Sequence, residues 1–173
     1  RTLRELLSRV PESCVRFVDL NLRKNCFSDE TIRWSVGNAD IVKLSEEEIS
    51  EVAAALGIDS PQNPAQMAES ICRDFPPSCC VITSGSMGAT ASSNRTGSLE
   101  TAEAVSRPVM VVDTVGAGDS FSAGFVHGWL QGLSLGNCLD FGNEMGGLAV
   151  SKAGGTAPFT DNDIAALLSK FAR

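Results

Sequence analysis

The chain has 173 residues, 43% of them hydrophobic, which is within the usual range of one compact domain. Its 21 acidic residues outnumber the 14 Lys and Arg residues, and the net charge of -7 would repel phosphate backbones and anionic lipid headgroups. We therefore expect neither nucleic acid nor a membrane as a partner. The six cysteines include no Cys-x-x-Cys pair, which favours reduced thiols and a cytoplasmic protein.

Short apolar runs bounded by turn residues alternate with amphipathic stretches in the first half of the chain. This alternation predicts parallel strands that are joined by crossover helices. Strands are expected at residues 15–20, 40–44 and 79–83, and helices at residues 28–36, 45–56 and 64–75. The helix at 45–56 opens with Ser45 and Glu48, which have the spacing of a capping box.

Residues 88–112 are rich in Ser, Thr and Val, with breaks at residues 94–97 and at Pro108, which predicts short antiparallel strands near a sheet edge. The apolar residues 109–112 are expected to form a strand that leads through a small-residue turn into a helix. Further helices follow from the apolar spacing, at residues 118–131, 135–152 and 161–171. The predicted fold class is α/β.

The run Asp-Thr-Val-Gly-Ala-Gly-Asp at residues 113–119 has the pattern of an anion site. Backbone N–H groups of Gly116, Ala117 and Gly118 can converge on a phosphate, and the helix dipole adds to the attraction. Asp119 would then lie in the first helical turn and take a proton from an attacking hydroxyl during phosphoryl transfer. The alternative is that Asp119 only interacts with the positive end of the helix.

Dinucleotide-binding and P-loop enzymes are not supported, because the chain has neither a Gly-x-Gly-x-x-Gly nor a Gly-x-x-x-x-Gly-Lys-Ser/Thr run. Residues 113–119 instead resemble the C-terminal signature of the pfkB/ribokinase family of carbohydrate kinases. Residues 83–88 resemble the family's Thr-x-Gly-x-x-Gly nucleotide loop. Residues 45–48 are similar to its Asn-x-x-Glu element, with Ser in place of Asn. Residues 19–23 resemble the Asp-x-Asn-x-Arg run of fructokinase-like members and their keto-acid-sugar relatives.

The resemblance implies an enzyme that uses ATP and Mg2+, with Asp119 as the catalytic base and the backbone of Gly116, Ala117 and Gly118 as an anion hole. The nucleotide contacts that it implies are Thr83, Gly85, Gly88, Asn143, Gly154 and Ser45. The substrate contacts that it implies are Asp19, Asn21 and Arg23. It also implies that Glu48 orders Mg2+ through water, and that Asp113 and Val115 hold a monovalent cation such as K+ beside the loop at residues 153–158.

Structural explanations compete with several of these roles. Ser45 and Glu48 fit a pure capping box equally well. Gly154 fits a helix C-cap before the proline at the end of its loop, and both roles are compatible. Arg23 fits a solvated surface loop, and Asn143 an ordinary polar position on a helix.

The family's fold is a ribokinase-like three-layer α/β/α sandwich with a mostly parallel central sheet. Residues 1–173 resemble only its C-terminal, nucleotide-binding and catalytic part. The N-terminal half is absent, including the sugar-binding lid through which a homodimer would form, so we expect residues 1–173 alone to have little or no activity. The expected reaction transfers the γ-phosphoryl group of ATP to a sugar hydroxyl, with fructose or a related keto-sugar as the leading acceptor. The alternatives are an adenosine-type nucleoside kinase and a catalytically inactive fructokinase-like binding or regulatory protein.

Overall fold

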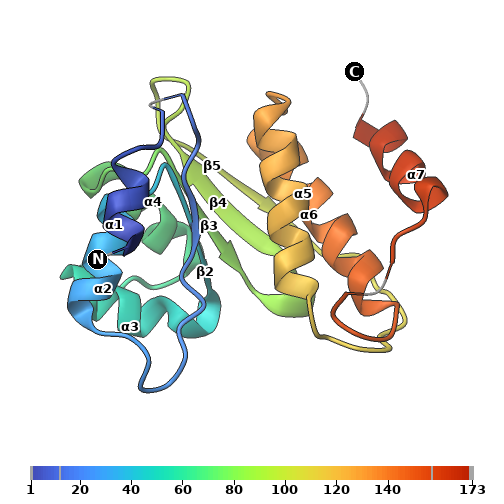
Figure 1. The fold of residues 1–173 in the computed structure, drawn as a ribbon, viewed down its shortest axis with the longest axis horizontal. Helices are drawn as coiled ribbons and strands as arrows, with labels where there is room; N and C mark the ends of the chain where they lie inside the picture. The colour runs from blue at the N-terminus through green and yellow to red at the C-terminus, as the bar shows by residue number, and fades with distance from the viewer. Residues whose placement is uncertain (1, 12, 157, 172–173) are drawn as a thin grey trace.

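A computed structural model describes residues 2–11, 13–156 and 158–171. Within these residues, one sheet has its strands in the order β1-β2-β3-β4-β5. The strands are β1 (Phe17–Asp19), β2 (Ile41–Ser45), β3 (Cys79–Thr83), β4 (Ala89–Ser93) and β5 (Glu100–Ala104). The first three strands run parallel, and β4 and β5 continue the sheet as an antiparallel hairpin (Figure 1).

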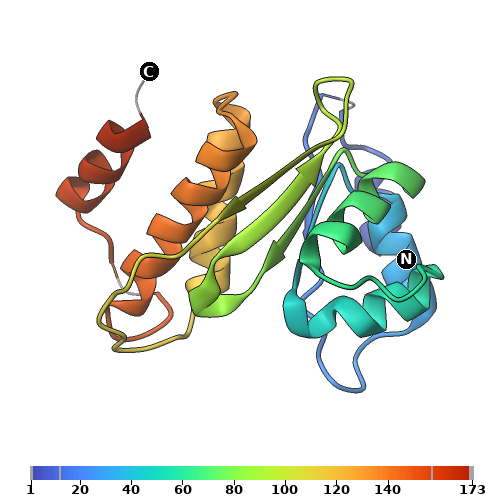
Figure 2. The same cartoon turned by 180° about the vertical axis from the view of Figure 1, so that it is seen from behind.

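Helices cover both faces of this sheet (Figures 1 and 2). One face carries α2 (Asp29–Gly37), α3 (Ile49–Leu56) and α4 (Pro64–Asp74), and α1 (Thr2–Leu7) lies against α2, where Arg4 contacts Glu30 and Trp34. The other face carries α5 (Ala117–Leu130) and α6 (Leu135–Val150), and α7 (Asp161–Phe171) packs on the side of α6 away from the sheet. Short 3-10 turns, η1 (Glu46–Glu48) and η2 (Gly85–Met87), follow β2 and β3. The expected three-layer α/β/α arrangement is confirmed.

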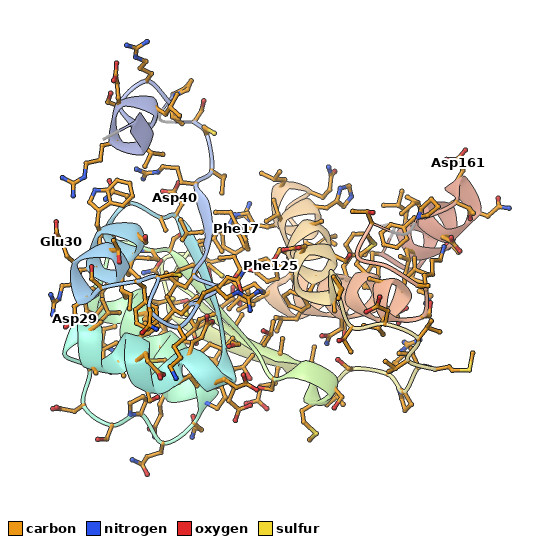
Figure 3. All side chains as sticks on the ribbon, turned by 60° about the horizontal axis from the view of Figure 1, so that its bottom comes forward. Phe17, Asp29, Glu30, Asp40, Phe125 and Asp161 are labelled. Atoms are coloured by element: carbon orange, nitrogen blue, oxygen red, sulfur yellow. The ribbon has the colours of Figure 1, made fainter. Side chains whose placement is uncertain are left out.

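Side chains alternate between the two faces along β2, as they must in a strand. Val42 and Leu44 belong to the core beneath α2, α3 and α4, whereas Ile41 belongs to the core beneath α5 and α6. Figure 3 labels Phe17 of β1 and Phe125 of α5, whose side chains both contribute to the core beneath α5 and α6. The next β2 residue that points toward α5 is a lysine, Lys43.

Glycines allow α5 and α6 to approach each other closely. A Cβ atom on Gly142 of α6 would lie 2.8 Å from the ring of Phe121 on α5. A Cβ atom on Gly124 of α5 would lie 2.8 Å from the carbonyl oxygen of Phe141 on α6. This close packing fixes α5 against α6, and it therefore fixes the first turn of α5 relative to the sheet.

Most predicted elements are present, with boundaries that shift by a few residues. The strand expected at 15–20 is shorter, and the helix expected from Ser45 begins as the 3-10 turn η1, with α3 starting at Ile49. The strand at 79–83 and the helix at 161–171 have the predicted bounds. Every described helix is too short or too polar to span a lipid bilayer.

The strand that was predicted at residues 109–112 is wrong. These residues are exposed, with Met110 at 81%, and they form a loop instead of a strand. The loop lies along α6, where the N–H groups of Val112 and Asp113 donate to the carbonyl oxygen of Val150 over 2.7 and 3.2 Å. The apolar pattern resembled a strand, but a strand also needs ladder hydrogen bonds to a neighbour, and these residues pair neither with the edge strand β5 nor with any other described strand.

Candidate active site

The N-terminal turn of α5 lacks a side-chain cap. Its N-cap is Gly116, which has a left-handed φ of 83°, and its first helical hydrogen bond runs from the N–H of Ser120 to the carbonyl oxygen of Gly116. The N–H groups of Gly118 and Asp119 precede that bond, so the helix itself gives them no partner. Side chains cap four other helices, through Ser28, Asn63, Ser134 and Thr160. This turn therefore offers the backbone donors that an anion needs.

Asp119 is exposed in this same turn. Its position is that of an acidic residue which stabilises a helix N-terminus, and it is also that of a base beside a bound anion. Phe121 and Phe125 follow on the buried face of α5 and anchor the helix to the sheet. Helical geometry thus holds the Asp119 carboxylate at the solvent end of a rigid element.

Asp113 ties the signature loop to the loop after α6. One of its carboxylate oxygens, Oδ1, accepts from the N–H of Val115 over 3.0 Å, and Oδ2 accepts from the N–H of Gly154 over 2.9 Å. These two backbone hydrogen bonds lower the pKa of Asp113 below its ordinary value. Residues 113–115 and Gly154 are therefore held together, as expected if they act at one site.

Contact between these two loops requires glycine. A Cβ atom on Gly116 would lie 2.6 Å from the carbonyl oxygen of Gly155, and a Cβ atom on Gly155 would lie 2.6 Å from a methyl carbon of Val115. Gly154 has a left-handed φ of 83°, but α6 ends at Val150 with Ser151 as its C-cap, so the C-cap interpretation of Gly154 is wrong. Ala157 of the expected loop lies outside the described residues.

The carboxyl ends of β2 and β3 lie side by side, which brings two more predicted residues together. Ser45 and Thr83 are register partners at the ends of these parallel strands. Thr83 is followed by Gly85, which is exposed and has a left-handed φ of 55°. Ligands of open α/β sheets bind outside the carboxyl ends of the strands, so Ser45, Thr83 and Gly85 are placed where a nucleotide could be reached.

Gly88 has a packing role in the structure. It is buried with a φ of 110°, and a Cβ atom on it would lie only 2.0 Å from the carbonyl oxygen of Ala104. Its own carbonyl oxygen accepts from the N–H of Ser84 over 2.8 Å. The glycine is therefore needed to close the turn between β3 and β4, whether or not it also approaches a nucleotide.

The carboxylate of Glu48 bridges two backbone segments. Oε2 accepts from the N–H of Ser45 over 2.7 Å, and Oε1 accepts a hydrogen bond from the N–H of Leu22. The first bond is the one that a capping box predicts, but the second joins the segment after β1 to the end of β2. Glu48 thus orients the residues that follow both strands.

Sequence reasoning placed Lys43 in a strand but gave it no role. Its ammonium nitrogen lies 2.6 Å from Oδ2 of Asp19, which is its register partner on β1. Lys43 is only 5% exposed, and its Nζ lies 3.7 Å from the position that a Cβ atom on Gly118 would occupy. The signal was a lysine inside an otherwise apolar strand, because lysine is rarely buried without a specific partner.

The other residues of the Asp-x-Asn-x-Arg run lie in the exposed segment after β1. Asn21 has a φ of 39°, and Arg23 makes no ion pair within the described part of the chain. The structure thus separates this run, because Asp19 faces Lys43 whereas Asn21 and Arg23 lie at the surface.

Asn143 lines a cavity of about 320 Å³ between α6, α7 and residues 105–109. Its amide nitrogen donates to the carbonyl oxygen of Ala104 over 3.0 Å, and its amide oxygen accepts from the hydroxyl of Ser106 over 3.3 Å. One amide N–H and one oxygen lone pair remain for a ligand. The cavity also has the charged side chains of Arg107, Asp140, Glu144, Asp163 and Lys170 on its walls.

The acidic side chains of this site fit a metal ion whose main ligands come from a bound nucleotide. No group of three His, Cys, Asp or Glu side chains in residues 2–11, 13–156 and 158–171 could enclose a metal ion. Mg2+ in phosphate sites keeps several waters and uses only one or two carboxylates. Glu48 keeps oxygen lone pairs beyond its two backbone bonds, so it could contact such an ion through water.

Comparison with known proteins assigns the chain to a family. A model of the pfkB family carbohydrate kinase matches residues 2–162. The ATP-dependent ribose-1-phosphate kinase of Halopiger xanaduensis is 39% identical over 62 residues, which cover 36% of this chain and 21% of that protein. The 2-dehydro-3-deoxygluconokinase of Haemophilus influenzae is 42% identical over 53 residues, which cover 30% of this chain and 17% of that protein.

A solved structure agrees in fold. The fructokinase from Vibrio cholerae O395, in its fructose, ADP and calcium ion bound form, has a TM-score of 0.74 and 24% identity to this chain. The alignment covers 97% of this chain and 54% of the fructokinase, so the chain spans about half the length of that structure and less of the curated relatives. The ribokinase-like fold is thereby confirmed, and the chain belongs to the pfkB family of carbohydrate kinases.

Proposed function

We propose that the protein transfers the γ-phosphoryl group of ATP to a hydroxyl of a sugar, with fructose or a related keto-sugar as the leading acceptor. The observation that supports this most is the first turn of α5, where uncapped backbone N–H groups and the exposed Asp119 carboxylate occur together. A carboxylate beside an anion site repels the anion. Its presence there is best explained if it accepts a proton during the reaction.

In the proposed reaction, the acceptor oxygen attacks the γ-phosphorus as the bond from that phosphorus to the β,γ-bridging oxygen breaks. The hydroxyl proton moves to a carboxylate oxygen of Asp119, and ADP leaves with the electron pair of the broken bond. Backbone N–H groups of Gly116 and Gly118 stabilise the charge on the transferring oxygens, and that of Ala117 joins them by exchanging its 3.3 Å hydrogen bond to the Thr114 carbonyl oxygen for one to the phosphoryl group. Glu48 would help to hold a bound Mg2+ through water, and the ion would neutralise charge on the phosphate oxygens.

The remaining nucleotide would extend from the α5 turn across the carboxyl ends of the strands. Ser45, Thr83 and Gly85 are proposed to contact it on the sheet side, with Gly88 supporting the turn. Asn143 and Gly154 are proposed to border it on the side of α6. Asp113 and the Val115 carbonyl would hold a monovalent cation such as K+ beside this loop, using lone pairs that the backbone bonds leave free.

The segment after β1 supports a proposal for the chemical class of the acceptor. Arg23 presents an exposed guanidinium there, and a guanidinium suits a carboxylate or phosphate oxygen. The curated relatives include a kinase of 2-dehydro-3-deoxygluconate, and the similar fructokinase structure contains fructose. These observations favour a keto-sugar or a keto-deoxy sugar acid over a nucleoside.

A substrate panel tests this function. The full-length protein is incubated with ATP and Mg2+ and with fructose, ribose, a 2-keto-3-deoxy sugar acid or adenosine, and both ADP and the phosphorylated product are measured. We expect product with a keto-sugar or keto-deoxy acid. Product with adenosine alone would support a nucleoside kinase. Calorimetry that finds no binding of millimolar ATP and Mg2+ would support an inactive binding or regulatory protein.

A further inference from the structure

Lys43 occupies an unusual electrostatic position. Among the described residues it is the only charged side chain that is buried. A lysine ammonium is strongly hydrated in water, so its burial is unfavourable unless other groups compensate for the lost hydration. The alternation of side chains along β2 places Lys43 on the face that α5 covers, where it is the next side chain after Ile41.

Asp19 supplies part of that compensation. Its Oδ2 accepts a hydrogen bond of 2.6 Å from the Lys43 ammonium, and its side chain is itself 25% exposed. An ammonium has three N–H donors, and the carboxylate takes one of them. The pair spans β1 and β2 at their carboxyl ends, which is where the sheet meets the first turn of α5.

The same ammonium lies beside the positive end of α5. Its Nζ is 3.7 Å from the position that a Cβ atom on Gly118 would occupy, and Gly118 has no side chain to separate the two. A cation near a helix N-terminus is unfavourable, because the aligned N–H dipoles already make that end positive. An anion bound between the ammonium and the α5 N–H groups would be stabilised by both.

We propose that Lys43 donates hydrogen bonds to the γ-phosphoryl oxygens during transfer. Asp19 is then a positioning residue that holds Lys43, and it does not contact the sugar directly. The inference rests on the proposed kinase function, and it adds a charged side chain to an anion hole otherwise built from backbone. Because Lys43 is buried and held at one point, it acts without the reorganisation that an exposed lysine would need. Asp19 was expected to bind substrate, but its Oδ2 already serves Lys43.

The direct test substitutes Lys43→Met in the full-length protein, which keeps the apolar stem and removes the charge. ADP with beryllium fluoride, a mimic of the γ-phosphoryl group, is titrated by calorimetry alongside ADP alone. We expect ADP affinity within about twofold of wild type, with at least about a tenfold loss in the affinity that beryllium fluoride adds, and kcat lower by about 100-fold. Unchanged beryllium fluoride binding and a kcat within about threefold of wild type would overturn the proposal.

A matched control is the other ion pair between the same two segments. Arg16 Nη2 lies 2.8 Å from Asp40 Oδ1 at the opposite, amino end of β1 and β2. Arg16→Met should lower thermal stability slightly and leave kcat within about twofold of wild type. If Lys43→Met fails to fold, the double variant Lys43→Met/Asp19→Asn removes both charges together and is tested in the same way.

Asp19→Asn separates positioning from sugar binding. If Asp19 positions Lys43, this variant lowers kcat and weakens binding of the beryllium fluoride mimic, while the KM for the sugar stays within about twofold. A sugar KM that rises about tenfold or more with kcat unchanged would make Asp19 a sugar ligand and overturn its positioning role. Wild-type protein that binds ADP and beryllium fluoride but phosphorylates no acceptor would remove only the acceptor assignment, because the mimic still tests Lys43. Wild-type protein that binds no ADP at millimolar concentration would remove the kinase function and this inference with it.

Discussion

Gly116 and Gly155 approach so closely that a Cβ atom on Gly116 would lie 2.6 Å from the carbonyl oxygen of Gly155. This contact joins the loop before α5 to the loop after α6. Asp113 strengthens the same junction through its hydrogen bond to the N–H of Gly154. The geometry of the proposed anion hole therefore depends on two segments that are about 40 residues apart in sequence.

Gly116→Ala should destabilise the protein and distort the site. The left-handed φ of 83° costs an alanine about 1–2 kcal/mol, and the clash with Gly155 adds to this because a carbonyl oxygen of the backbone cannot rotate away. We expect a lower midpoint in urea unfolding together with a large loss of turnover. A variant with wild-type stability would show that the two loops are not in contact as described.

Gly118→Ala, in contrast, should not destabilise the protein. Gly118 is helical, and the atom nearest to a methyl group added at this position is Lys43 Nζ, at an uncrowded 3.7 Å. Alanine in place of glycine within a helix gains up to about 1 kcal/mol. The methyl group would nevertheless occupy the space between Lys43 and the α5 turn, so kcat should fall by about tenfold or more while the thermal midpoint is maintained. Full activity in this variant would place the phosphoryl group elsewhere.

Packing between α5 and α6 should be sensitive to one methyl group. In Gly142→Ala, the new Cβ would lie 2.8 Å from the Phe121 ring, which is 5% exposed and enclosed by the core. Such overpacking costs about 1–3 kcal/mol in chemical denaturation, more than the helical preference of alanine returns. Adding Phe121→Leu should relieve the strain, with a coupling energy of at least about 0.5 kcal/mol in a double-mutant cycle. Purely additive effects would contradict this packing.

Attachment of α7 should depend on pH at the acidic end. Asp163 accepts hydrogen bonds from the Lys152 ammonium and from the N–H of Thr160, and the Lys152 bond is the main cause that lowers the pKa of Asp163 to about 2. Because this folded-state pKa is below the unfolded value of about 4, the stabilisation is present above about pH 4 and is lost as the pH falls toward about 2.

The measurement is the thermal midpoint between about pH 5 and pH 2. We expect Asp163→Asn to be less stable at the upper end of this range and to lose less stability as the pH falls. Asp161→Asn is the control, since Asp161 lies in the same helical turn and points away from the sheet at the tip of α7 (Figure 3). Parallel pH curves for wild type and Asp163→Asn would contradict the assignment.

Local patterns predicted much of this fold because their physical causes are local. Alternating apolar runs identified the strands and helices, and the small residues at 116–118 identified an uncapped helix start. Residues 109–112 were mistaken for a strand because an apolar pattern does not reveal whether a partner strand is available.

The charged part of the site could not be predicted from spacing alone. The pairing of Asp19 with Lys43 requires the register between β1 and β2, which no single segment encodes. The second hydrogen bond of Glu48, to Leu22, likewise depends on how the segment after β1 folds back onto the end of β2. Gly88 matched a nucleotide loop by sequence, yet the structure requires a glycine there because a Cβ atom would clash with the carbonyl oxygen of Ala104 on β5.

The central claim is that Asp119 accepts the proton of the acceptor hydroxyl. The most direct measurement is kcat of Asp119→Asn in the full-length protein, with ATP, Mg2+ and the best acceptor of the panel, together with its affinity for ADP. We predict that kcat falls by about 100-fold or more while ADP affinity stays within about threefold of wild type, because the backbone anion hole is retained. A kcat equal to that of the wild type would contradict this account and leave Asp119 as a helix-stabilising residue.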